Sequence, residues 1–168
     1  MSVKKGTAQT KLESLILYFA SNIPLHLGKK KLAKLMYFVD FTAYELLQEP
    51  ISREKYMKYL YGPMPVRFYD ILKDMVSKNM LEVGEQPAEF IPSTIVAKVP
   101  PDLSVFTPVE LKLIEAITNE HKLSTAKELE LKAQAEPPYK MVELNEEIPY
   151  HLALYRNTFG EMDIEDVD

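Results

Sequence analysis

Asp40 is the residue whose type and surroundings come closest to catalytic chemistry. It lies three residues after Tyr37 and four residues before Tyr44, on the aromatic side of an apolar segment. A carboxylate in such surroundings can have a raised pKa and exchange protons, so Asp40 with Lys34 and Tyr37 is a candidate hydrolase or transferase site. The alternative, which we favour, is a structural carboxylate bonded to a neighbouring tyrosine hydroxyl or arginine.

The remaining chemistry-bearing residues form no recognisable centre. His26, His121 and His151 are far apart in the chain, so we expect surface or helix-end histidines and no metal site. Cysteine is absent, and the five glycines form no phosphate-binding loop. The sequence therefore predicts no metal, no cofactor and no enzymatic activity.

A basic cluster is the clearest charged feature. It comprises residues 29–31 and Lys34, and Arg53, Lys55 and Lys58 extend it. Aromatic residues near these cations can stack on bases, so a DNA-binding regulator is one interpretation. Because the pI is near 5.3, a solubilising basic patch or a surface that docks a protein is favoured over a surface that binds phosphate.

The apolar residues follow helical spacing in two N-terminal segments. The first begins after Thr7, which can cap it, and ends before Pro24. The second, from about Lys29 to Gln48, is apolar almost all round, which is typical of a helix enclosed by others. We expect this second segment to be the central buried helix that carries Asp40.

Shorter elements are expected on both sides of a Pro-Pro break. Pro63 and Pro65 suit the first turn of a third helix. The predicted order is a strand at 54–61, this helix at 63–79 and a hairpin of residues 80–84 and 90–99 that turns at Gln86-Pro87. Beyond the break we predict three further helices. The first, at 107–120, begins with a capping box at Thr107. The second, at 124–129, is capped by Ser124 and closed by Pro137-Pro138, and the third lies at 148–157. The helix, strand, helix and hairpin order also reads as winged-helix-like, which keeps the DNA-binding alternative open.

These elements predict a mainly α (α+β) fold, a compact helical domain around a central buried helix with a small antiparallel β-sheet. We expect one domain over residues 1–160, with an N-terminal part at 7–99 and a C-terminal helical part at 103–157. Pro100-Pro101 separates the two parts. Residues 161–168 contain five acids and no base, which predicts a flexible acidic tail.

The charge of the chain is unevenly distributed. The net charge is −5, but residues 1–80 carry 13 basic and 7 acidic residues, or +6, and the rest carries −11. Such asymmetry can guide the encounter with a charged partner. No apolar run is long enough for a membrane span and no signal peptide is evident, so we expect a soluble cytoplasmic protein.

Two motifs resemble the Panacea domain, the SocA-like antitoxin family. Lys31–Asp40 reads KLAKLMYFVD, which is similar to the K-L-x-K-L-x-Y-[FY] helix of that family, and Tyr59–Pro65 is similar to its Y-G-P-[VM] element. Leu123–Leu129 and Pro138-Tyr139 resemble its C-terminal signals more weakly. The resemblance covers roughly residues 12 to 155. One departure is that Ala133 and Gln134 stand where the family often has a Ser/Thr-His pair.

The resemblance implies a non-enzymatic protein that neutralises a toxin encoded nearby by binding it directly, either by masking it or by handing it to a protease. A DNA-binding regulator remains the alternative, and the oligomeric state is open. The motif positions predict the partner-binding residues Lys34, Tyr37, Asp40, Tyr61, Gly62, Pro63 and Arg67. For Tyr37, Tyr59 and Tyr61 we favour core positions over contact positions.

Overall fold

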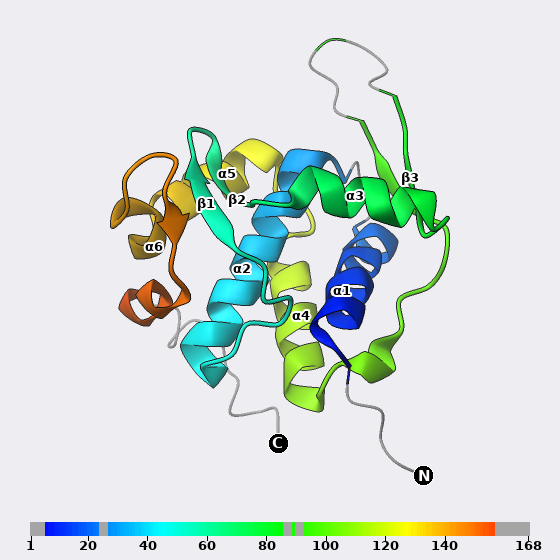
Figure 1. Cartoon of the computed structure of the whole chain (residues 1–168), viewed down its shortest axis with the longest axis horizontal. Coiled ribbons are helices and arrows are strands. Elements are labelled where there is room, and N and C mark those ends of the chain that lie inside the picture. Colours follow the sequence, from blue (N-terminus) through cyan, green and yellow to red (C-terminus); the bar gives the residue numbers. More distant parts are fainter. Residues whose placement is uncertain (1–5, 24–26, 86–88, 90–92, 157–168) are drawn as a thin grey trace.

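The fold is mainly α with small antiparallel sheets, as predicted (Figure 1). The computed structural model describes residues 6–23, 27–85, 89 and 93–156. The expected features at Pro24, His26, Gln86-Pro87 and 161–168 lie outside these residues. Within them, no helix is both long and apolar enough to cross a membrane.

Helix α1 (Ala8–Asn22) begins and ends where the sequence predicts. The Thr7 hydroxyl accepts a hydrogen bond from the Thr10 amide at 3.1 Å, which satisfies a free amide of the first turn. At the other end Ile23 has an extended backbone. The apolar face of α1, including Leu15 and Ile16, is buried.

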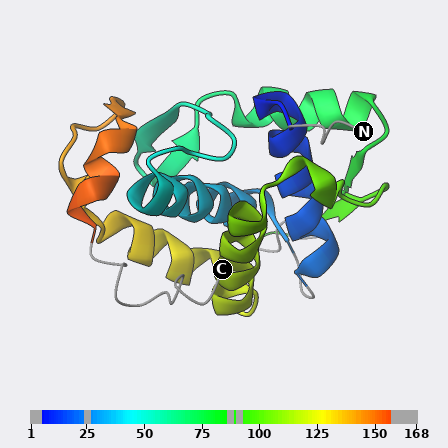
Figure 2. The same cartoon turned by 90° about the horizontal axis from the view of Figure 1, so that it is seen from below.

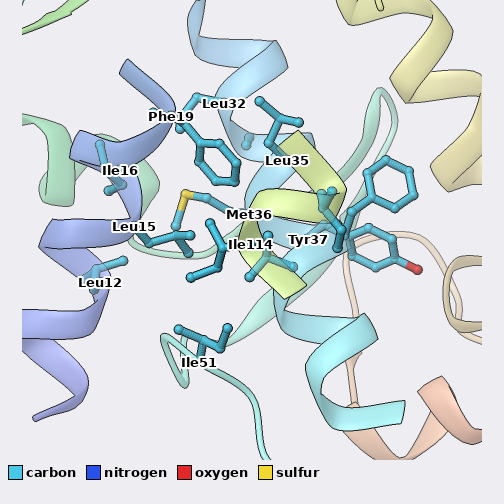
Figure 3. Close-up of a cluster of buried hydrophobic side chains, with 14 of the residues drawn as sticks. Leu12, Leu15, Ile16, Phe19, Leu32, Leu35, Met36, Tyr37, Ile51 and Ile114 are labelled. Atoms are coloured by element: carbon cyan, nitrogen blue, oxygen red, sulfur yellow. The ribbon is translucent and has the colours of Figure 1, made fainter. Parts of the chain in front are cut away.

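Helix α2 (Lys29–Leu47) is the central helix of the fold. Every residue from Lys31 to Ala43 is buried, because α1 and four later elements pack against this helix (Figures 1 and 2). These elements are β2 (Gly62–Pro65), α4 (Pro108–His121), α5 (Ala126–Gln134) and the 3₁₀ segment η2 (Tyr150–Tyr155). Figure 3 shows the resulting core, in which α1, α2 and α4 contribute side chains such as Leu15, Met36 and Ile114. The prediction of a helix enclosed on most sides is confirmed.

The segment after α2 forms a hairpin, and the predicted helix start at Pro63 and Pro65 is wrong. Strand β1 (Tyr56–Tyr59) pairs antiparallel with β2 (Gly62–Pro65) and with β5 (Glu147–Ile148), in the order β2-β1-β5. Both prolines lie in β2, an edge strand, where a missing N–H is tolerated. Helix α3 (Phe68–Ser77) begins only after Arg67.

The predicted second hairpin is present but shorter. Strand β3 (Leu81–Val83) pairs antiparallel with β4 (Ile95–Ala97), and this pair forms a separate sheet. The Ile95 amide donates to the Leu27 carbonyl at 2.8 Å, which ties β4 to the segment before α2.

Three C-terminal helices pack beside α2 or next to one another. After the short η1 (Leu103–Val105), α4 (Pro108–His121) has the predicted Thr107 capping box. Helix α5 (Ala126–Gln134) is capped by Thr125 and not by Ser124, because the Thr125 hydroxyl accepts from the Glu128 amide at 3.0 Å. Helix α5 ends at Gln134, and the two prolines begin the next helix, α6 (Pro137–Lys140).

The last predicted helix, at 148–157, is present only as a shorter 3₁₀ helix. Ile148 is drawn into β5 by pairing with Tyr56, and Pro149 keeps the backbone extended. Only the 3₁₀ segment η2 (Tyr150–Tyr155) follows.

Candidate protein interface

The seven predicted site residues occupy three places in the fold. Lys34, Tyr37 and Asp40 lie along α2, Tyr61, Gly62 and Pro63 lie at the β1–β2 turn, and Arg67 precedes α3. Two of them, Tyr61 and Arg67, are exposed, and the other five are buried. The structure brings Lys34 next to Gly62, whereas Arg67 follows the opposite end of β2.

Asp40 is a fully buried carboxylate with four hydrogen bonds. It accepts from the amides of Ile51 and Ser52 at 2.9 and 2.8 Å, from the Ser52 hydroxyl at 2.5 Å and from the Tyr56 hydroxyl at 2.6 Å. Burial raises the pKa of Asp40, and these bonds act in the opposite direction. Because a substrate has no access to it, this geometry favours the structural role over the catalytic one.

Tyr37 belongs to the core, as expected. Its ring stacks on Phe41 with a centroid distance of 4.6 Å, and its hydroxyl donates to Glu136 at 2.9 Å. The same Glu136 carboxylate accepts two hydrogen bonds from Arg156, which also reaches Glu45. Through Glu136, Tyr37 therefore links the central helix to Arg156, the residue after η2.

The other two tyrosines differ from Tyr37. Tyr59 is half-buried, and Tyr61 is 61% exposed, so the expected core position is wrong for Tyr61. The reason is the turn: Tyr59 pairs with Gly62, and the two residues between them point outward from the end of the hairpin. Leu60, which the sequence analysis did not select, is 63% exposed beside Tyr61.

The backbone of this turn is held in place from two helices. The Tyr139 hydroxyl donates to the Tyr59 carbonyl at 2.7 Å, and the side-chain amide of Gln134 donates to the Leu60 carbonyl at 3.1 Å. Tyr139 belongs to a motif that the resemblance had singled out, and Gln134 is the departure from the family pattern. Leu60 and Tyr61 are thus displayed on a fixed backbone, which lowers the entropy lost when they become contacts.

Lysines surround this hairpin end. The Lys30 ammonium lies 5.0 Å from the centroid of the Tyr61 ring, and Lys58 lies 4.5 Å from that of Tyr139. Lys34 is only 2% exposed, and burial lowers the pKa of its ammonium to about 8, with Glu130 opposing and Lys30 adding to the shift. We define the hairpin-end surface as Leu60 and Tyr61 with Lys30 and Lys34.

Gly62 allows Lys34 to reach this surface. Gly62 has a φ of +110°, and a β-carbon there would lie 2.4 Å from Lys34 Cε. No other residue type combines this backbone conformation with the space the lysine needs. The glycine of the Y-G-P element and the lysine of the helix motif are therefore in direct contact.

Arg67 has a separate role. Its guanidinium donates to both carboxylate oxygens of Glu54 at 3.1 and 2.7 Å, and the carbonyl of Glu54 accepts from the Tyr150 hydroxyl. This exposed arginine therefore braces the start of β1 and does not join the hairpin-end surface.

His121 and His151, the histidines within the described residues, show no metal-ligand geometry. His121 ends α4 but is buried and stacks on Phe38 at 5.0 Å, and burial lowers its pKa to about 4. His151 is exposed. Among the residues that the structure describes, no group of three or more His, Cys, Asp or Glu is placed to hold a metal ion.

Comparison with known proteins identifies the family. No curated protein and no solved structure showed significant similarity to the chain. The family model described as "Antitoxin SocA-like, Panacea domain" matches residues 32–140, a narrower range than the predicted 12–155 but one that contains most of α2, the hairpin and α5. The match covers well over half of the sequence, and the chain therefore belongs to the SocA-like antitoxin family with a Panacea domain.

Proposed function

We propose that this protein neutralises a toxin by direct protein–protein contact, in the cytoplasm and without catalysis. The observation that carries the proposal is the hairpin end, where Leu60 and Tyr61 are exposed on a backbone held by Gln134 and Tyr139. Exposed aromatic residues on rigid supports are typical of interface hot spots. The family to which the chain belongs supports an antitoxin-like role.

Of the seven motif residues, Tyr61 makes the direct contact in this proposal, with Lys34 at its side. Gly62 and Pro63 shape the turn, and Tyr37, Asp40 and Arg67 hold the elements that carry it. A substitution at Asp40 would then reduce neutralisation by destabilising the fold, whereas a substitution at Tyr61 would remove a contact and leave the fold intact.

The test is co-expression with the product of the adjacent gene, scored by growth. We expect the neighbour alone to stop growth, the wild-type protein to restore it, and Tyr61→Ala to restore it poorly at equal soluble yield. Tyr155→Ala is the matched control, because Tyr155 is 63% exposed on η2, away from the hairpin turn. A harmless neighbour, or equal rescue by both variants, would contradict the proposal.

Masking and delivery to a protease predict different toxin levels. If the protein masks its partner, the toxin accumulates in a stable mixed complex that size exclusion detects. If it delivers the partner to a protease, the toxin half-life falls when the antitoxin is made and recovers in a protease-deficient strain. We propose masking as the primary mode, because the hairpin end is already an ordered surface.

DNA binding is the weaker alternative. The β3–β4 hairpin follows α3 as a wing would, but the exposed face of α3 carries Asp70 and Asp74 with Lys73. Two acids on the expected recognition helix oppose phosphate contacts. A salt titration of binding to promoter DNA decides the matter, since absent binding at about 50 mM salt removes the alternative.

A further inference from the structure

We propose that the ammonium group of Lys34 binds a carboxylate of the partner protein beside the exposed hairpin turn. This inference rests on the proposed function and adds the chemistry that the partner must present. It starts from a buried cation that nothing in the described protein pairs.

The Lys34 side chain crosses the interior and reaches the surface only at its tip. It passes Gly62 so closely that a β-carbon there would lie 2.4 Å from Lys34 Cε and 3.3 Å from Nζ. Within the described part of the chain, Nζ makes no hydrogen bond or ion pair, yet no fully buried side-chain nitrogen or oxygen is left without a hydrogen-bond partner. The nitrogen must therefore still touch solvent, at the hairpin end.

The surroundings of Nζ favour a negatively charged ligand. Lys30, one helical turn earlier, adds positive charge and lies over the Tyr61 ring. Glu130 acts on Lys34 electrostatically, but its carboxylate is engaged by Lys127 at 2.7 Å. A buried cation without a bonded counter-ion is unfavourable in the free protein, and an incoming anion would relieve that.

The ligand is more consistent with a protein carboxylate than with a phosphate. Lys34 offers one largely buried ammonium, and Glu130 beside it would repel a dianion more strongly than a monoanion. The exposed side chains next to it, Leu60 and Tyr61, suit an apolar neighbour of the acidic residue. An aspartate or glutamate that flanks an apolar side chain of the partner fulfils both conditions.

The test compares Lys34→Met with wild type in calorimetric titrations of the toxin from the adjacent gene. Methionine retains much of the buried stem and removes the charge, and far-UV circular dichroism checks that the variant is folded. We expect at least a tenfold rise in Kd for Lys34→Met and less than a twofold change for the control Lys112→Met, whose lysine is exposed on α4.

A double-mutant cycle distinguishes a specific ion pair between Lys34 and one acid of the toxin from general electrostatic attraction. Each Asp and Glu of the toxin is changed to its amide and tested against both antitoxin forms. Coupling of Lys34 to one acid supports the inference, and equal small couplings to many acids overturn it. If wild type binds and Lys34→Met binds equally well, the inference fails while the proposed function stands. If wild type does not bind at all, the proposed function fails and the inference falls with it.

Discussion

At the scale of single residues, Asp40 organises the start of the hairpin. Its carboxylate accepts two amides and two hydroxyls from Ile51, Ser52 and Tyr56. Asp40→Ala should lower the free energy of unfolding by about 3–5 kcal/mol, since it leaves two buried amides without an acceptor. Urea denaturation measures the loss. Asp70→Ala, on the exposed face of α3, should change stability by less than about 0.5 kcal/mol, and comparable losses for both variants would contradict this account.

Lys34 should make the free protein less stable than it would be with a neutral side chain. Because burial lowers the Lys34 pKa from 10.5 to about 8, Lys34→Met should raise the free energy of unfolding at pH 7 by up to about 3 kcal/mol. Between pH 8 and 10.5 the unfolded wild-type chain binds a proton that the folded one has lost. Wild-type stability therefore rises with pH in this window, and the advantage of the variant shrinks.

Thermal unfolding of both proteins at pH 7, 8.5 and 10 checks that prediction. A constant difference across the series would mean that the Lys34 pKa is not lowered. With the binding loss expected for the same variant, a gain in stability would show that Lys34 serves recognition at the expense of the free fold.

The sequence alone placed residues on helices better than it predicted the contacts that they make. Helical spacing correctly put Tyr37 and Asp40 on the enclosed helix. It could not show that Asp40 would meet Ser52 and Tyr56, since those contacts depend on where the chain turns after α2. Nor could it separate exposed Tyr61 from buried Tyr37, because a turn position and a core position can hold the same residue type.

At the scale of elements, the hairpin end depends on α5 and α6 for its rigidity. Tyr139→Phe removes the 2.7 Å hydrogen bond to the Tyr59 carbonyl. We expect a loss of about 1 kcal/mol in stability, faster amide exchange in the hairpin, and weaker neutralisation although no contact residue has changed. Hydrogen exchange by mass spectrometry measures the effect, with Tyr155→Phe as the control. Unchanged hairpin exchange would show that the turn is rigid without this bond.

The predicted elements succeeded where local signals agree with packing. Caps at Thr7 and Thr107 and the apolar period of α2 are local features, and they defined α1, α2 and α4 correctly. Pro63 and Pro65 suit both a helix start and an edge strand, and only the pairing with β1 decides between them. The helix predicted at 148–157 starts later than expected for a similar reason, since Ile148 in β5 pairs with a strand about 90 residues earlier in the chain.

At the scale of the whole molecule, some bases of the first half pair with acids of the second half. Lys11 pairs with Glu110 at 2.9 Å in a largely buried contact, and Lys55 pairs with Glu147 at 3.3 Å on the surface. Part of the asymmetry along the sequence therefore joins the halves together. Under the proposed function, Lys30 and Lys34 at the hairpin end, which form no ion pair with the residues that the structure describes, would add to the attraction of a negatively charged partner.

Because α2 packs against elements from both sides of Pro100-Pro101, we predict that residues 7–99 and 103–157 unfold together. Leu15→Ala in α1 and Ile114→Ala in α4 should each lower the free energy of unfolding by about 2–5 kcal/mol. Each variant should therefore lower the midpoint of one shared urea transition. Circular dichroism and tyrosine fluorescence should give coincident curves. Leu123→Ala, at a residue that is 72% exposed, should leave the midpoint in place. Two separate transitions, with only one sensitive to Ile114→Ala, would mean two independent units.

The contact between Gly62 and Lys34 also restricts how this protein can evolve. A side chain at position 62 would collide with the lysine stem and would require a left-handed backbone, so position 34 has to become shorter first. The reverse order, a shorter residue at 34 beside an unchanged glycine, meets no such barrier. Substitutions at the two motifs should therefore accumulate in one direction across related sequences, with losses of the lysine preceding losses of the glycine.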